Sequence, residues 1–123
     1  METVKQILAE RGYDSVEEME LGESVTVQCE GYMDLTISRL SKTTVSVAHT
    51  YEENWDQMSD PEIVFDVSGD KWTAIEYIRH PHLHQHDNSG LPGAQSFADG
   101  MWNRNLRAQG FIDAASRPEG VVE

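Results

Sequence analysis

The sequence between residues 24 and 78 alternates apolar and polar side chains, a pattern typical of strands that bury one face. In residues 24–30, Val25 and Val27 alternate with threonine and glutamine. The same period of two recurs in four later segments, residues 33–39, 43–51, 62–67 and 71–78. Neighbouring strands that run parallel need long crossover connections, whereas the connections between these segments are short. The pattern therefore predicts an antiparallel meander of five strands.

A helix is predicted on each side of this strand region. In residues 2–11, Val4, Ile7 and Leu8 form one apolar stripe, and Thr3 with Gln6 has the spacing of a capping box. Residues 15–18 repeat the capping-box spacing and predict a single helical turn.

The second helix is predicted to begin at residue 93 or 94 and to end at residue 108. Its apolar face would comprise Ala94, Phe97, Ala98, Met101 and Trp102. Gly110 suits the left-handed position after its last turn. The order of elements predicts a two-layer α+β domain over residues 1–115, with both helices on one face of the sheet. Residues 116–123 are expected to form a flexible tail.

Length and cysteine content narrow the class of protein. A chain of 123 residues fits one domain, and its single cysteine, Cys29, excludes an internal disulfide. The N-terminal segment lacks the apolar core of a signal peptide, and no apolar run approaches the about 20 residues that span a bilayer. We expect a soluble cytoplasmic protein.

The charge of the chain is strongly negative. There are 22 acids against 9 lysines and arginines, a net charge of −13. Residues 12–38 and 43–70 contain acids but no lysine or arginine. Such a field repels phosphates, so we expect no direct binding to nucleic acid or to anionic membranes. It would attract cations or a basic protein partner, although a high charge also serves solubility alone.

Histidines at every second position form the clearest candidate for metal chemistry. They are His80, His82, His84 and His86, and Asp87 follows. In an extended chain the four rings would share one face, and two neighbouring rings could bind one zinc, nickel or copper ion. The alternatives are a solvated loop over residues 85–93, with Pro81 ending the fifth strand, and a cluster that senses pH by protonation. No cofactor is predicted beyond this zinc or nickel hypothesis.

A second candidate region is the acidic segment at residues 49–62. Carboxylates around Trp55 could act in acid–base chemistry or bind hard cations, but the ligand pattern of a calcium-binding EF-hand loop is absent. The plain interpretation is a solvated connection between the third and fourth strands, with Asp60 and Pro61 forming a turn.

This segment resembles an uncharacterised family of small domains found mainly in bacterial, phage and plasmid proteins. The resemblance lies in the sequence HTYEENWDQMSDPE at residues 49–62, followed by a strand and Trp72. Two positions depart from the family pattern, Glu53 in place of glutamine and Trp55 in place of glycine. The resemblance implies a shared α+β domain without a known activity. It also directs attention to a candidate surface cluster of His49, Glu52, Asn54 and Asp56.

No recognised catalytic motif occurs in the sequence. Cys29 follows the alternation of Val25 and Val27, and His49 falls on the same side of its strand as Val45. No nucleophile elbow and no phosphate-binding glycine loop is present.

The sequence thus favours a non-enzymatic accessory or protein-interaction module of unknown function. The first alternative is a metal-binding or pH-sensing protein that uses the histidines at positions 80–86. The second is an acidic mimic of nucleic acid, which would require carboxylates on one continuous face.

Overall fold

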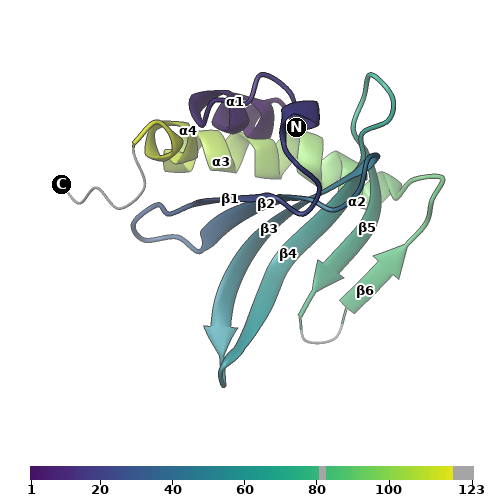
Figure 1. The fold of residues 1–123 in the computed structure, drawn as a ribbon. Helices are drawn as coiled ribbons and strands as arrows, with labels where there is room; N and C mark the ends of the chain where they lie inside the picture. The colour runs from purple at the N-terminus through teal and green to yellow at the C-terminus, as the bar shows by residue number, and fades with distance from the viewer. Residues whose placement is uncertain (81–82, 118–123) are drawn as a thin grey trace.

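The computed structural model describes residues 1–80 and 83–117, which form a single antiparallel sheet covered on one face by helices (Figure 1). The strands are β1 (Ser24–Val27), β2 (Asp34–Arg39), β3 (Thr44–Glu53), β4 (Asp56–Asp66), β5 (Thr73–Arg79) and β6 (Leu83–His86). They lie side by side in chain order, and every neighbouring pair is antiparallel. The predicted α+β class and antiparallel meander are confirmed. Residues 118–123 of the predicted flexible tail lie outside the described residues.

The predicted number of five strands is wrong, because the histidine segment adds a sixth. In β6, His84 lies opposite Ile78 of β5 and His86 lies opposite Glu76. All four residues of β6 are exposed, so no apolar alternation marks the strand in the sequence. Backbone pairing with β5 is what makes it a strand.

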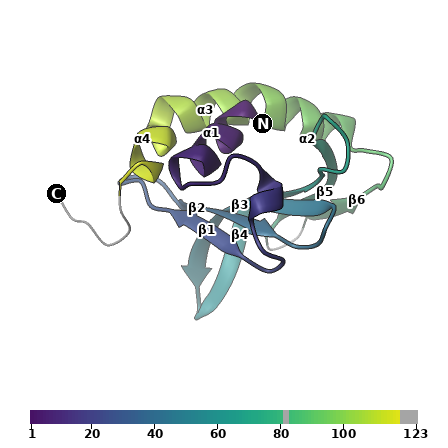
Figure 2. The ribbon, with the colours of Figure 1, turned by 45° about the horizontal axis from the view of Figure 1, so that its top comes forward.

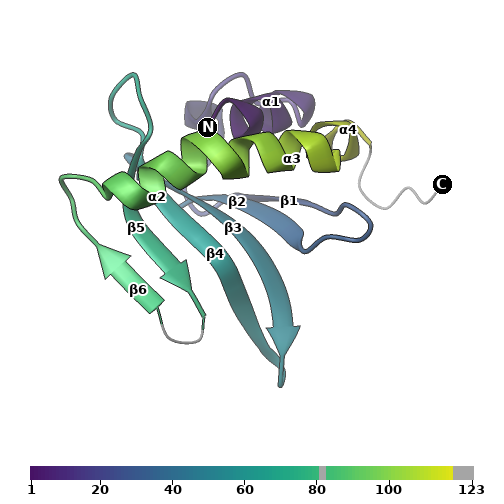
Figure 3. The ribbon, with the colours of Figure 1, turned by 180° about the vertical axis from the view of Figure 1, so that it is seen from behind.

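The helices are α1 (Glu2–Glu10), the 3₁₀ turn η1 (Val16–Glu18), α2 (Pro92–Phe97), the π-helical segment η2 (Ala98–Trp102), α3 (Asn103–Gln109) and α4 (Phe111–Ala115). The segments α2, η2 and α3 follow one another as one long helix, and α1 lies beside it on the same face of the sheet (Figures 2 and 3). The predicted helical cover of one sheet face is confirmed. Within residues 1–80 and 83–117, no helix has the length and apolar character needed to cross a membrane.

The predicted capping box at the start of α1 is wrong. The N-cap is Met1, and it makes no side-chain capping bond. Thr3 instead ties α1 to α3, because its backbone N–H donates to Asn103 Oδ1 and its hydroxyl donates to the Asn103 carbonyl, both at 2.9 Å. The hydroxyl thus serves tertiary packing.

The two faces of the sheet differ in chemistry. The face under the helices is apolar and includes fully buried Val27, Leu35 and Phe65. On the opposite face hydroxyls pair across strands: Thr26 Oγ1 lies 3.2 Å from Thr36 Oγ1, and a serine pair flanks it. The core therefore sits between the sheet and the helices, and the outer face is free for polar contacts.

The β3–β4 hairpin extends past its neighbours as a two-stranded finger (Figures 1 and 3). The ladder with β2 ends at Thr50, and the ladder with β5 ends at Glu62. Beyond these points, residues 51–58 pair only with each other. Asp60 and Pro61 form an irregularity inside β4, so the predicted turn at these two residues is wrong. A proline lacks the N–H that a regular ladder needs, which explains its place there.

Candidate functional site

His84 and His86, two of the four histidines predicted to share one face, lie on β6 at the edge of the sheet. His84 Nε2 is 3.3 Å from Glu76 Oε2, and His86 Nδ1 is 3.2 Å from Glu76 Oε1. His86 Nε2 also lies 2.9 Å from Asn88 Oδ1. Both ring nitrogens of His86 thus lie within hydrogen-bond distance of an oxygen atom, so the ring is held between Glu76 and Asn88.

Asp87, the fifth residue of the predicted ligand set, is held in a local turn. The Ser89 hydroxyl donates to Asp87 Oδ1 at 2.6 Å, and this bond lowers the pKa of the carboxyl group. Among residues 1–80 and 83–117, no three histidine, cysteine or acidic side chains are placed to hold a metal ion. His82 lies outside the described residues, so the complete four-histidine ligand set stays a prediction.

His80 lies apart from the other histidines, on the outer face of the sheet. Its Nδ1 accepts a hydrogen bond from the Ser59 N–H at 2.7 Å, so the neutral ring carries its hydrogen on Nε2. The Glu62 carboxylate nearby accepts hydrogen bonds from the hydroxyls of Ser46, at 2.6 Å, and Ser59, at 3.2 Å. Together these groups line a shallow hollow of about 320 Å³.

This hollow holds the residue types of a hydrolase triad, but the hydrogen bonds that link a triad are absent among these described residues. A catalytic serine hydroxyl donates to histidine, and the histidine donates to the acid. Here the Ser59 hydroxyl donates directly to Glu62, while His80 is bound to the Ser59 backbone. The geometry favours a rigid polar surface over an activated nucleophile.

The predicted cluster of His49, Glu52, Asn54 and Asp56 is divided by the structure. The last three are exposed around the tip of the β3–β4 finger. His49 is only 8 % exposed, and it lies on the sheet face beneath the helices, as its alternation with Val45 implies. It therefore cannot share a surface cluster with the other three.

The finger ends in a two-residue turn whose second residue is a tryptophan. Asn54 has φ +53° and Trp55 has φ +71°, the left-handed values of a type I′ hairpin turn. Asparagine tolerates this region, whereas a bulky residue is an outlier there. Trp55 is 98 % exposed, so it gains no packing that offsets the strain.

His49 lines a second hollow, of about 210 Å³, between the sheet and the long helix. Its Nδ1–H donates to the Met33 carbonyl at 3.2 Å. The centre of its ring lies 5.7 Å from the ring centre of Trp102 and 5.5 Å from that of Phe111. Burial lowers the pKa of His49, because the charged ring loses hydration. At neutral pH the ring is uncharged.

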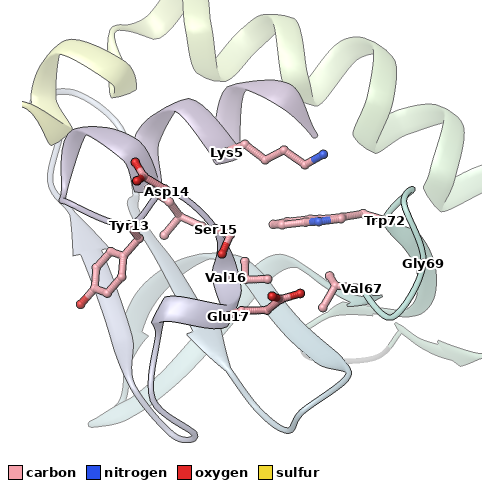
Figure 4. Close-up of a pocket in the computed structure, with 10 residues that line it drawn as sticks. Lys5, Tyr13, Asp14, Ser15, Val16, Glu17, Val67, Gly69 and Trp72 are labelled. Atoms are coloured by element: carbon pink, nitrogen blue, oxygen red, sulfur yellow. The ribbon is translucent and has the colours of Figure 1, made fainter.

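A third hollow, of about 250 Å³, opens beside Trp72 between α1, η1 and the β4–β5 turn (Figure 4). Lys5 Nζ lies 5.7 Å from the centre of the indole ring, and Val16 and Val67 lie on its other side. Glu17 brings the opposite charge to this wall. With Lys5 already over the ring and both signs of charge present, the hollow favours neither an anion nor a cation.

Comparison with known protein families finds one family model that matches most of the chain. The model of a family described as a domain of unknown function (DUF6908) matches residues 2–112. The chain belongs to this family. No curated protein and no solved structure matches the chain. The DUF6908 match spans the whole sheet and the helical segments from α1 to α3, so the expectation of an uncharacterised small α+β domain is confirmed.

Two features of this DUF6908 domain escaped the sequence interpretation. The first is the finger, because residues 49–62 form a hairpin where the sequence predicts an acidic connection. Its signal was the tryptophan at a position where glycine is expected. The second is the hollow beside Trp102, for which the pattern gave no signal because a π-helical segment positions that side chain.

His49 is expected to make the stability of this DUF6908 domain depend on pH. Its folded pKa is below the unfolded value of 6.5, so the unfolded state takes up the proton first. The stability tied to neutral His49 is complete above about pH 6.5 and is lost as the pH falls below it. In denaturant titrations, the gap in unfolding free energy between wild type and His49→Asn should shrink from about pH 7.5 to about pH 5.5. If the unfolding free energies of wild type and His49→Asn differed by the same amount at every pH, the assignment of the pH dependence to His49 would be contradicted.

Proposed function

We propose that this protein is an interaction module that binds a basic segment of another protein through the tip of the β3–β4 finger. The observation that carries the proposal is Trp55, a fully exposed indole held in a left-handed conformation at the end of a projecting hairpin. A strained residue without an internal contact points to an external one.

The composition of the tip selects the chemistry of the partner. Trp55 lies between Glu52 and Asp56, both exposed. Indole is the best aromatic partner for arginine and lysine in cation–π contacts, and carboxylates pair with the same groups. Tryptophan is also enriched among the residues that dominate binding energy at protein interfaces.

The overall charge favours another protein over a second copy of this chain. Two copies meeting at their tips would bring acids together on molecules that each carry a net charge of −13. A basic partner would be steered toward the finger by the same field. Exposed carboxylates occur on α1, on η1 and at the finger tip alike, which does not support a mimic of nucleic acid with one acidic face.

The test is a selection of peptides from a random displayed library against the whole protein. The proposal predicts selected peptides rich in arginine and lysine, whose binding weakens as salt rises. Replacing Trp55 by alanine should weaken their binding by about thirtyfold or more, as loss of an interface hot spot does. Leu40→Ala is the matched control, because Leu40 is 52 % exposed in the β2–β3 turn at the opposite end of β3.

Trp55→Gly separates binding from folding. Glycine adopts the left-handed region freely, whereas other residues spend about 1–2 kcal/mol there, part of which the flexibility of unfolded glycine offsets. Trp55→Gly should therefore raise the free energy of unfolding by up to about 1 kcal/mol relative to Trp55→Ala, measured by denaturant titration, while both variants lose peptide binding. Selected peptides that lack basic residues, or that still bind Trp55→Ala, would overturn the proposed function.

A further inference from the structure

We propose that the hollow beside Trp102 binds a small uncharged aromatic molecule that carries a hydrogen-bond acceptor. The hollow lies between the sheet and the long helix, away from the finger tip, so this inference is independent of the proposed function. Its walls include Met33, Phe97 and Trp102, and its polar groups come from His49, Asn105 and Gln109. A mostly apolar hollow with a few converging polar groups is the usual form of a small-molecule site.

The first argument is a buried donor without an acceptor. Trp102 is 3 % exposed, and its Nε1–H has no hydrogen-bond partner among the described residues. Buried donors in proteins are almost always paired, because water no longer hydrates them. A carbonyl oxygen of a bound molecule would satisfy this N–H. The N–H is covered from solvent, so a lining side chain must shift first, and Phe97 and Gln109 are only partly buried.

The second argument is the π-helical segment that positions Trp102. In an α-helix, residues five apart point in different directions, because each residue turns by about 100°. The π-helical η2 brings Phe97 and Trp102 into a stack, with ring centres 5.6 Å apart and ring planes at 15°. Single π-helical turns are rare and are frequently found at functional sites. Here the turn builds a flat aromatic wall.

The third argument concerns the charge and size of the ligand. Apart from His49, no residue that lines this hollow in the described chain is acidic or basic. His49 is neutral, and its Nδ1–H is already donated to the Met33 carbonyl. A charged ligand would therefore lose hydration without gaining a counter-charge. The volume of about 210 Å³ is below that of drug-sized sites and suits one substituted ring.

The experiment is a titration of the ¹⁵N-labelled whole protein with benzamide, toluene and benzoate, followed by NMR. The indole N–H signals of Trp55, Trp72 and Trp102 are assigned with single Trp→Phe variants. The proposal predicts that benzamide shifts the Trp102 signal downfield and leaves the Trp55 signal in place. Toluene and benzoate should bind more weakly than benzamide.

The matched variants are Trp102→Phe, which keeps an aromatic ring and removes the donor, and Trp55→Phe, which makes the same change elsewhere. Trp102→Phe should weaken the binding of benzamide by about tenfold and leave the binding of toluene unchanged. Trp55→Phe should change the binding of neither ligand. If Trp102→Phe fails to fold, the preference of wild type for benzamide over toluene decides. A Trp102 signal unmoved at saturating benzamide, equal affinities for benzamide and toluene, or shifts spread over all three indoles would overturn the proposal.

Discussion

Replacing Phe111 by alanine is expected to lower the free energy of unfolding by about 3–5 kcal/mol, the usual range for a buried aromatic residue. Phe111 is fully buried at the start of α4, and its ring centre lies 5.5 Å from that of His49. It follows Gly110, whose φ of +95° turns the chain back over the sheet. Alanine would leave a cavity at the junction of α4, β3 and the His49 hollow.

The matched control is Tyr32→Ala. Tyr32 belongs to the same aromatic group, with its ring centre 6.2 Å from that of Phe111, but it is 48 % exposed. Its removal should therefore cost much less, about 1 kcal/mol. Denaturant titrations of the two variants at neutral pH measure both values. Equal losses would show that burial does not set the contribution of Phe111.

Replacing Asn103 by alanine is expected to lower the free energy of unfolding by about 1–3 kcal/mol. Asn103 Oδ1 accepts the N–H of Thr3, a fully buried residue in the first turn of α1. The first N–H groups of a helix have no partner within the helix, so alanine leaves this donor buried and unpaired. Asn103 thus joins two helices that are distant in sequence.

Asn103→Asp provides the control for this bond. Aspartate has nearly the same shape and keeps the acceptor oxygen, so it should retain most of the stability that alanine loses. Protection of the Thr3 amide against hydrogen exchange should follow the same order. An aspartate variant as unstable as the alanine variant would rule out the acceptor as the cause.

The parts of the fold that sequence could predict are those in which apolar periodicity reports burial. Val25, Val27 and Leu35 lie on the inner sheet face, as alternation predicts. The same rule predicts that His49 lies on the same sheet face as Val45, and His49 is indeed buried there. The proximity of His49 in sequence to residues 52–56 does not predict its position, because Glu52, Asn54 and Asp56 are exposed. A histidine in phase with buried valines belongs to the core.

The parts that sequence could not predict depend on contacts between distant residues. Strand β6 has four exposed residues, so only its pairing with β5 defines it. Thr3 has the sequence spacing of a helix cap, yet the hydrogen-bond partner of its hydroxyl is Asn103 at the start of α3. The π-helical segment η2 lies within a region whose apolar pattern predicts a regular helix. Trp55 departs from the family pattern in the sequence, but only the backbone angles of the turn show that it occupies a left-handed position.

The open sheet has consequences for how the protein behaves when it is concentrated. An open sheet leaves two edges, and unpaired backbone groups along an edge can recruit strands from other chains into aggregates. Here the edges are β1 and β6, each only four residues long, and β6 carries His84 and His86 on its surface. An intruding strand would therefore gain few backbone hydrogen bonds at either edge, and short edge strands are a known device against such growth.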